Sequence, residues 1–377
     1  MIATDPHYQI CSRCIMDTSA AGISFDAEGH CNFCTEFLER SGALVLNVDP
    51  EKRERELQAL VERVKREGKG KKYDCIVGVS GGVDSSWVLV EAVEMGLRPL
   101  AVHMDNGWNS ELAQSNIENL VRTLGVDLVT HVIDWEEYRK LMQAFFDSHV
   151  IDIELLYDNA MLAVNYQQAA KFGIRNILAG TNQATEGMRF PQGWNHLKFD
   201  RRNIVAIARQ FGRVKIDTFP SIGVLGFIYH EYIKKRRWIS VLDLIDYNKE
   251  DVLAALEESY RYRRYPYKHY ESVFTRFYQG YILIEKFGVD KRRVHFSTLI
   301  AAGQMKREDA MANMEKIAYP SQKDLDADIQ YFLKKMNWSE QQLKDYLAAP
   351  PRLHADYPSE APLYEFFKKV YFKLFRR

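Results

Sequence analysis

The sequence lacks the features that would place a protein in a membrane, outside the cell or on a polyanion. No apolar run in its 377 residues approaches the roughly 20 residues needed to span a bilayer. The first residues are polar, without the basic start and apolar stretch of a secretory signal. Since 51 Lys and Arg balance 51 Asp and Glu, no overall positive field attracts nucleic acid. We therefore expect a cytoplasmic protein that inserts into no membrane and binds no nucleic acid.

Cysteine is scarce, and four of the five cysteines stand in two short motifs. Cys11 and Cys14 form one C-x-x-C pair and Cys31 and Cys34 form the other, whereas Cys75 stands alone in an apolar run. In a reducing compartment such pairs indicate a metal site rather than disulfides. Four thiolates favour a tetrahedral structural Zn²⁺. An iron–sulfur cluster and a redox pair are the alternatives.

Short apolar runs alternate with amphipathic segments in the middle of the chain. The continuous apolar run at 74–79 is typical of a parallel strand that is buried on both faces. Further strands are predicted at 99–104, 128–133 and 176–181, and helices at 49–67, 87–93, 110–124, 135–146 and 152–172. This alternation predicts an α/β fold with a doubly wound parallel sheet, which binds ligands beyond the carboxyl ends of its strands.

Beyond residue 200 the sequence is mainly helical and rich in aromatic residues. Asn248 is a suitable N-cap for a helix at 249–258, residues 260–270 alternate basic and aromatic side chains, and 363–377 fit an amphipathic helix. We expect three parts, namely a four-cysteine zinc ribbon over 1–48, a nucleotide-binding α/β domain over 49–200, and a helical, aromatic-rich region for substrate or partners over 201–377.

A glycine-rich loop follows the first predicted strand and leads into a helix. It reads Ser80-Gly81-Gly82-Val83-Asp84-Ser85-Ser86. The paired glycines allow a tight turn, so that backbone amides and the N–H groups of the helix can hold phosphate. The serine hydroxyl groups add donors, and Asp84 can hold a Mg²⁺ that neutralises a polyphosphate. A plain glycine turn is the alternative, which the flanking strand, helix and hydroxyl groups disfavour.

This loop resembles the Ser-Gly-Gly-x-Asp-Ser signature of the PP-loop ATP pyrophosphatases, which include asparagine, guanylate and NAD synthetases and several tRNA-modifying enzymes. The resemblance implies that ATP is cleaved between its α and β phosphates and that AMP passes to a substrate oxygen, from which a nitrogen or sulfur nucleophile displaces it. It also implies nucleotide contacts by His103, Asp105, Gly180, Thr181 and Asn182. For His103 a hydrogen-bonded core histidine is the alternative, and for Asp105 a loop cap.

Two blocks in the C-terminal half narrow the resemblance. Residues 268–277 and 291–299, together with the cysteine ribbon, resemble the N-acetyl sugar amidotransferases of surface-polysaccharide biosynthesis. The likeness runs from residue 11 to about 314. It implies an ATP-dependent enzyme that adenylylates the acetamido oxygen of an N-acetylated sugar acid, either nucleotide-linked or nonulosonic. Ammonia then gives an acetamidino sugar for lipopolysaccharide (LPS) O-antigen, with release of AMP and pyrophosphate.

Charge builds on phosphate oxygens in such a reaction, so positioning and cationic stabilisation should supply most of the catalysis. Lys268 and Arg276 are the candidates for this cation and for binding the sugar carboxylate, and Arg261, Arg263 and Arg264 are weaker ones. A glutaminase needs a cysteine nucleophile with a histidine partner, and no cysteine is left for that role. By resemblance, ammonia is free or comes from separate subunits like the glutaminase and cyclase pair of imidazole glycerol phosphate synthase.

Two other interpretations remain open. A PP-loop tRNA-thiolating enzyme also joins a cysteine ribbon to such a loop, but thiolation needs a further reactive cysteine pair or an iron–sulfur site. Residues 260–270 could stack bases, although such a stretch more often packs its rings in a core with the charges outward. A nucleotide sensor or scaffold would keep the loop without turnover. Pyrophosphate release that depends on an acetamido sugar separates both from the amidotransferase.

Overall fold

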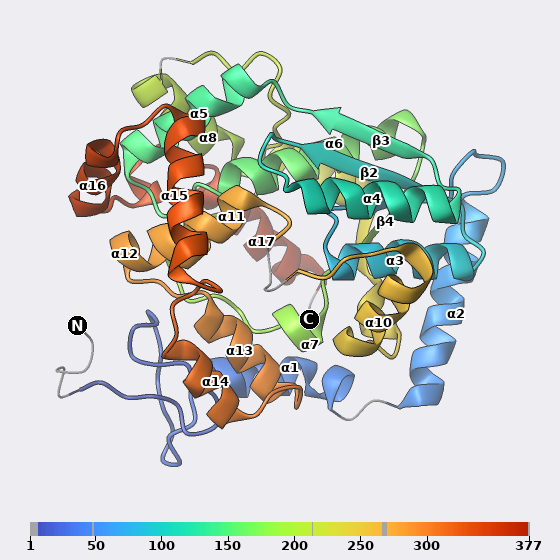
Figure 1. Cartoon of the computed structure of the whole chain (residues 1–377). Coiled ribbons are helices and arrows are strands. Elements are labelled where there is room, and N and C mark those ends of the chain that lie inside the picture. Colours follow the sequence, from blue (N-terminus) through green and yellow to red (C-terminus); the bar gives the residue numbers. More distant parts are fainter. Residues whose placement is uncertain (1–6, 47–48, 213, 266–269, 376–377) are drawn as a thin grey trace.

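The computed structural model describes residues 7–46, 49–212, 214–265 and 270–375. Its centre is a five-stranded sheet in which all neighbouring strands are parallel (Figure 1). The order is β3-β2-β1-β4-β5. The strands are β1 (Cys75–Gly78), β2 (Pro99–Asp105), β3 (Leu128–Val132), β4 (Asn176–Ala179) and β5 (Arg237–Ser240). The predicted doubly wound α/β fold is confirmed.

The predicted helices are present, with ends displaced by a few residues. They are α2 (Pro50–Glu67), α3 (Val83–Glu94), α4 (Glu111–Leu124), α5 (Trp135–Ser148), α6 (Leu155–Lys171), α10 (Lys249–Tyr260) and α17 (Ala361–Phe375). Asn248 caps α10 as expected, because its side chain accepts hydrogen bonds from the N–H groups of Glu250 and Asp251. The other helices are α1 (Asn32–Val45), α7 (Gln183–Glu186), α8 (Arg201–Ile207), α9 (Val224–Ile228), α11 (Val273–Phe277), α12 (Leu283–Phe287), α13 (Arg292–Ala301), α14 (Arg307–Met314), α15 (Gln322–Met336) and α16 (Glu340–Ala348).

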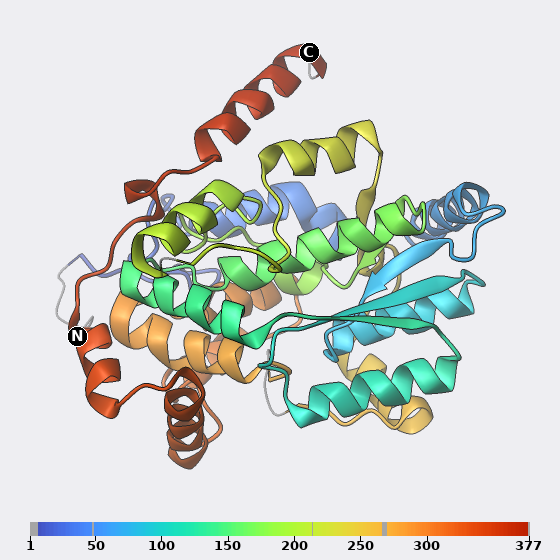
Figure 2. The same ribbon diagram turned by 90° about the horizontal axis from the view of Figure 1, so that it is seen from above.

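Alternate residues of the central strand enter two apolar cores on opposite faces of the sheet. Ile76 packs in one core with residues of α6, whereas Cys75 and Val77 pack in the other with residues of α3 and α4. Successive side chains of a strand point to opposite faces, so both faces of β1 are buried, and its sequence is continuously apolar for this reason. Figure 2 shows α6 and α4 on opposite sides of the sheet.

The fifth strand was not predicted, because it lies in the stretch that the sequence marks as mainly helical. β5 pairs with β4 at the edge of the sheet, with Ile177 opposite Trp238. All four of its residues are only partly buried, and a basic run at 234–237 leads into it. A short, half-exposed edge strand therefore carries little apolar signal.

The region after β5 adds an aromatic group to one of the two apolar cores of the sheet. A continuous helix runs from Val273 to Phe287 through α11, the π-helical turn η4 (Tyr278–Ile282) and α12. Phe274 of this helix and Phe332 of α15 pack on Trp108, which follows β2. One apolar core contains cysteines of the ribbon, strand residues and this aromatic group together. The division at residues 48 and 200 stays a prediction.

No helix in the described part of the chain is long and apolar enough to cross a membrane.

A buried polar cluster joins the short helix η5 (His354–Asp356) to α8. Nδ1 of His354 lies 2.8 Å from Oδ1 of Asn203, and the N–H of Asp152 donates to Nε2 at 3.3 Å. The ring of His354 stacks on His196 with 4.3 Å between centroids. Burial lowers the pKa of His354 to about 3, so the imidazole is neutral in the folded protein.

The pH dependence of the free energy of unfolding should reflect the protonation of His354. The unfolded chain binds a proton at His354 below a pKa near 6.5, but the folded chain does not until about pH 3. Stability therefore falls as the pH falls from about 6.5 to about 3, by up to about 1.4 kcal/mol per pH unit from this residue. Urea unfolding at pH 7, 6 and 5 should give a shallower slope for His354→Gln. The exposed His7→Gln variant should keep the wild-type slope, and equal slopes in both variants would contradict the assignment.

Candidate functional site

The glycine-rich loop lies at the carboxyl end of β1, where the connections to β2 and β4 diverge. Gly82 is the N-cap of α3 and makes no side-chain cap bond, which leaves the first N–H groups of the helix to a ligand. Gly81 has φ +85°, and a Cβ there would lie 2.7 Å from the carbonyl oxygen of Ala113. Only glycine combines this backbone conformation with this close contact.

The hydroxyl groups of the loop hold its turn. Oγ of Ser85 accepts from the N–H of Ser80 and donates to the carbonyl of Gly82, each at 3.2 Å. Oγ of Ser80 accepts from the N–H of Gly82 at 3.2 Å. Oγ of Ser86 is buried and has no partner among the described residues. The loop is thus pre-formed, with a hydroxyl group left over for a ligand.

Three tyrosines from the C-terminal region support this loop. The hydroxyl groups of Tyr262 and Tyr265 donate to the carbonyl oxygen of Gly81 at 3.1 and 3.0 Å. The hydroxyl group of Tyr247 makes a very short hydrogen bond to Oδ1 of Asp84. Burial, and then the neighbouring Asp84, raise the pKa of Tyr247, so the phenol remains a donor at neutral pH.

The arginines of the same stretch point away from the loop. Arg264 forms ion pairs with Glu257 at 2.8 Å and with Glu250 at 3.3 Å, both on α10. Arg263 donates to Oγ of Ser115 at 3.4 Å, and Arg261 ends α10 in a left-handed conformation. This arrangement fits the alternative in which the rings pack inward and the charges face outward.

Two residues that were predicted to contact the nucleotide, His103 and Asp105, form hydrogen bonds within the protein. Nδ1 of His103 lies 2.8 Å from the carbonyl oxygen of Val79, and Nδ2 of Asn109 lies 3.0 Å from Nε2. Oδ1 of Asp105 accepts from the N–H of Gly107 at 2.8 Å. His103 therefore supports the residue before the loop, and Asp105 caps the turn after β2. Contact of either side chain with nucleotide stays a prediction.

The predicted segment after β4 lies directly against the loop. A Cβ on Gly180 would be 2.8 Å from the backbone nitrogen of Ser85, so β4 and α3 approach closely only because this residue is glycine. Oγ1 of Thr181 is exposed and lies 2.9 Å from Oγ of Ser240. Asn182 caps α7 through Oδ1, whereas its buried Nδ2 has no partner among the described residues. That amide is a donor available to a ligand.

A cavity of about 550 Å³ opens beside the loop. Its lining includes Ser80 of the loop and residues of α6, α10, the helix at 273–287 and α13. Its acidic and basic lining residues are Glu154, Asp158, Glu186, Lys198, Lys249, Glu271, Arg276, Asp290, Lys291, Arg292, His295 and Lys316. Both signs of charge are present, which suits a polar substrate that carries hydroxyl and ionised groups.

Ion pairs order the far wall of the cavity. Glu154 accepts from Nζ of Lys291 at 2.8 Å and from Nε2 of Gln279 at 2.9 Å. Nζ of Lys198 lies 2.8 Å from carboxylate oxygens of both Asp152 and Asp158. Burial opposes ionisation of Asp152, but the positive charge of Lys198 outweighs it and lowers the pKa of Asp152 to about 2. Burial raises the pKa of Asp158.

Of the two predicted catalytic cations, the structure describes only Arg276. Arg276 lines the cavity and donates from Nε and Nη2 to Asp328 at 2.5 and 2.6 Å. Burial lowers its pKa, but the bond to Asp328 outweighs this and raises it. Its charge is therefore largely neutralised, with N–H groups left over. Lys268 lies outside the described residues.

Several residues that line the cavity were not predicted from the sequence. Lys198, Glu154 and Gln279 come from distant parts of the chain and match no motif, and Gln279 enters the cavity from the π-helical turn η4. Lys249 had a detectable signal. It occupies the first turn of α10, where a cation is unfavourable because of the helix dipole, and a residue that breaks a local rule is a candidate for function.

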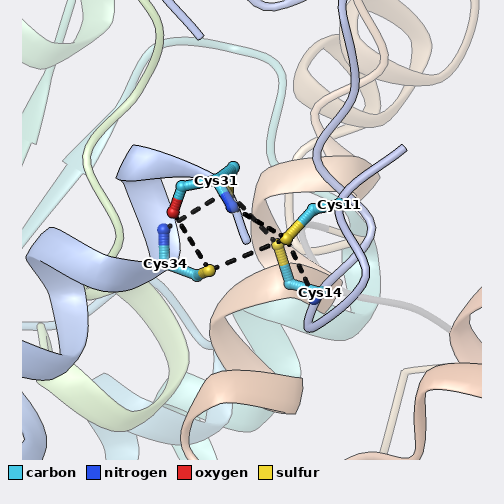
Figure 3. A group of neighbouring side chains, drawn as sticks. All are labelled: Cys11, Cys14, Cys31 and Cys34. Carbon is cyan, nitrogen blue, oxygen red and sulfur yellow. Dashed lines mark hydrogen bonds between the residues drawn. The ribbon is translucent and has the colours of Figure 1, made fainter. Parts of the chain in front are cut away.

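The four ribbon cysteines form a candidate metal centre. Their sulfur atoms all lie within 4.8 Å of one another, and all four residues are buried (Figure 3). The N–H of Cys31 points to Sγ of Cys11 at 3.1 Å, and that of Cys14 points to the same sulfur at 3.4 Å. A compact group of buried thiols with N–H donors fits a four-thiolate Zn²⁺ site.

This centre supports one wall of the cavity. Arg307 of α14 donates to the carbonyl oxygens of Cys14 and Cys11 at 2.9 and 3.0 Å. Arg293 of α13 donates to the carbonyl of Ile15 at 2.6 Å. Figure 1 shows the N-terminal segment beside α13 and α14. Because α13 lines the cavity, the ribbon supports the site through packing.

Two known protein families match parts of the chain. Residues 54–190 match the family described as NAD synthase. Residues 271–371 match the family described as LPS biosynthesis protein WbpG-like, C-terminal domain. The first match, with the sheet and the loop, defines a PP-loop protein of the NAD-synthase type. The two matches together support a PP-loop protein of LPS biosynthesis with an ATP-using, amidotransferase-type role.

Solved structures with a similar fold share little sequence with the chain. The NH3-dependent NAD synthetase from Campylobacter jejuni, in complex with nitrate, is 15% identical with a TM-score of 0.29, over 57% of this chain and 94% of that one. NMN synthetase from Francisella tularensis is 15% identical with a TM-score of 0.29, over 59% and 99%. A predicted subunit of tRNA methyltransferase from Methanocaldococcus jannaschii is 16% identical with a TM-score of 0.28, over 49% and 74%. A search of curated proteins found no match.

The close contact at Gly180 gives a test of the loop. Gly180→Ala places a Cβ 2.8 Å from the nitrogen of Ser85 and displaces the start of α3, so ATP turnover should fall by about 100-fold. Gly42→Ala is the matched control, because a Cβ there meets nothing within 4 Å. ATP turnover and thermal unfolding of both variants check this expectation. Wild-type turnover in Gly180→Ala would show that the loop does not hold the nucleotide.

Metal content tests the ribbon. We expect one Zn²⁺ per chain, and removal by a chelator should lower the melting temperature and raise KM for the second substrate more than for ATP. Cys14→Ser should lose the metal, whereas Cys75→Ala should keep it, because Cys75 lies in β1 away from the centre. Elemental analysis with visible absorption distinguishes zinc from an iron–sulfur cluster. Iron with visible absorption, or no metal, would contradict the zinc assignment.

Proposed function

We propose that the chain is an ATP-dependent amidotransferase that converts the acetamido group of an N-acetylated sugar acid into an acetamidino group. One observation carries this proposal. The cavity is lined both by Ser80 of the PP-loop and by Arg276, Gln279 and Lys291, which fall in the region that matches the LPS biosynthesis family. A nucleotide on the loop and a polar substrate on those residues would share one cavity.

The reaction has two steps. The amide oxygen attacks the α-phosphorus of ATP, so that an O-adenylyl imidate forms and pyrophosphate leaves. Ammonia then adds to the imidate carbon, AMP leaves with the oxygen, and the acetamidine retains the nitrogen. The loop amides and the start of α3 would hold the departing pyrophosphate. Asp84 would hold Mg²⁺, which supplies charge neutralisation of the phosphates when bound.

The cavity offers cations for both reactants. Lys249 lines the cavity at the start of α10, two residues after Tyr247, which supports the loop, so we assign it to the phosphates. Arg276 keeps N–H groups that are not bonded to Asp328 and can meet the carboxylate of the sugar acid. Catalysis then needs no covalent nucleophile from the protein, since positioning and charge stabilisation suffice.

The cysteines favour nitrogen over sulfur as the nucleophile. Four of the five lie in the ribbon, and Cys75 is buried in β1, where burial raises the pKa of its thiol. Among the described residues that line the cavity none is a cysteine, so a thiolation step has no sulfur carrier there. For the same reason the chain itself should not hydrolyse glutamine, and ammonia is supplied free or by separate glutaminase and cyclase-like subunits.

The decisive experiment supplies ATP, Mg²⁺, ammonium and a panel of N-acetylated sugar acids to the full chain. We expect sugar-dependent AMP and pyrophosphate, and by mass spectrometry a product about one dalton lighter, from exchange of O for NH. Asp84→Asn should lower kcat/KM by about 100-fold or more. Asp246→Asn is the matched control, because that carboxylate is 98% exposed. Formation of ADP and orthophosphate, or AMP release that depends on tRNA instead of sugar, would contradict the proposal.

A further inference from the structure

Half of the described large apolar side chains that are exposed gather on two neighbouring segments. Leu225, Tyr229, Tyr232 and Ile233 lie on α9 and the π-helical turn η2 (Tyr229–Ile233), and Phe366, Val370 and Tyr371 lie on α17. Their exposed fractions run from 37% to 66%. The rings of Tyr232 and Tyr371 are 5.7 Å apart, so both segments contribute to one surface, which we call the α9–α17 surface.

The helix α17 is attached to the body mainly at its first turns. The ring of Tyr364 packs edge-on against Phe199 with 5.0 Å between centroids, whereas Phe366 is 60% exposed. Figure 2 shows α17 standing away from the rest of the molecule. Phe366 and Val370 are four residues apart and therefore lie on one side of the helix. An apolar helix face without cover in the described chain needs a partner.

The α9–α17 surface is strongly basic, although the whole chain has a net charge of zero. Lys234, Lys235 and Arg236 follow η2 directly, and Lys368, Lys369 and Lys373 lie on α17; all are exposed except Arg236, which is half-buried. Residues 224–236 and 361–375 contain only two carboxylates, Glu231 and Glu365. The hydroxyl group of Tyr166 donates to Glu231 at 2.8 Å, and Glu365 lies 3.4 Å from Lys368. The net charge of these two segments is therefore positive.

The combination of exposed apolar side chains and positive charge on the α9–α17 surface favours one kind of partner over others. A second copy of the chain would place like charges opposite one another, which opposes pairing of the surface with itself. Aromatic rings flanked by lysines suit the boundary between lipid headgroups and acyl chains, where the rings enter the apolar layer and the ammonium groups meet phosphate. We propose that the α9–α17 surface binds an anionic lipid bilayer, with α17 lying in the plane of the headgroups.

Flotation with vesicles tests this proposal on the full chain. The protein should float with vesicles of phosphatidylcholine that contain about one-third phosphatidylglycerol, and little with phosphatidylcholine alone. Binding should decrease as salt rises, because salt screens the lysines. Lys368→Glu/Lys369→Glu should lower the partition coefficient by about tenfold or more. Phe366→Ser/Tyr371→Ser should lower it to a similar extent without changing the charge, because the buried apolar area is lost.

Two matched variants exclude general effects of charge and exposure. Lys323→Glu/Lys344→Glu reverses two exposed lysines on α15 and α16, and Val132→Ser removes a side chain that is 69% exposed on β3; both should bind vesicles as the wild type does. Circular dichroism and the melting temperature verify that each variant is folded. Equal binding to neutral and anionic vesicles, or none to either, would overturn the proposal. So would a dimer in sedimentation velocity that Phe366→Ser/Tyr371→Ser abolishes, because a second copy would then cover the surface.

Discussion

The carbonyl oxygen of Gly81 accepts hydrogen bonds from two tyrosine hydroxyl groups, and the site is organised around this contact. An anion-binding loop works because its amides point in one direction, and a loop of glycine and serine does not keep that geometry by itself. Bonds from Tyr262 and Tyr265 fix the carbonyl side of the turn. The amide side is therefore directed at the place where phosphate would bind.

The same contact connects the two halves of the protein. The loop belongs to the sheet, and the tyrosines belong to the segment after β5, so the C-terminal region helps to shape the nucleotide site. In turn, Ser80 of the loop lines the same cavity as residues of the helix at 273–287 and of α13. Neither half would form this cavity alone. The ribbon extends the arrangement, because Arg307 and Arg293 tie α14 and α13 to the carbonyl groups beside the cysteines.

Local sequence patterns predicted most of the fold. β1, β2 and β4 are buried runs between turn residues, and their alternation with amphipathic helices is the direct consequence of a parallel sheet covered on both faces. β5 was not predicted, because a half-exposed edge strand of four residues has neither a long apolar run nor a clear alternation of apolar and polar residues. The loop was identifiable because its glycines, serines and aspartate each have a role that their own chemistry explains, from the left-handed Gly81 to Asp84 in the first turn of α3.

The sequence by itself determined the parallel sheet, the phosphate-binding loop and the four-cysteine ribbon, because each is specified by residues that are close together in the chain. Only the tertiary structure decided that Lys249, Lys198 and Gln279 line the cavity, that Arg276 is paired with Asp328, and that both ring nitrogens of His103 are hydrogen-bonded inside the protein. These are contacts between residues far apart in sequence, and the pairing of one charge with another depends on packing that no local pattern encodes.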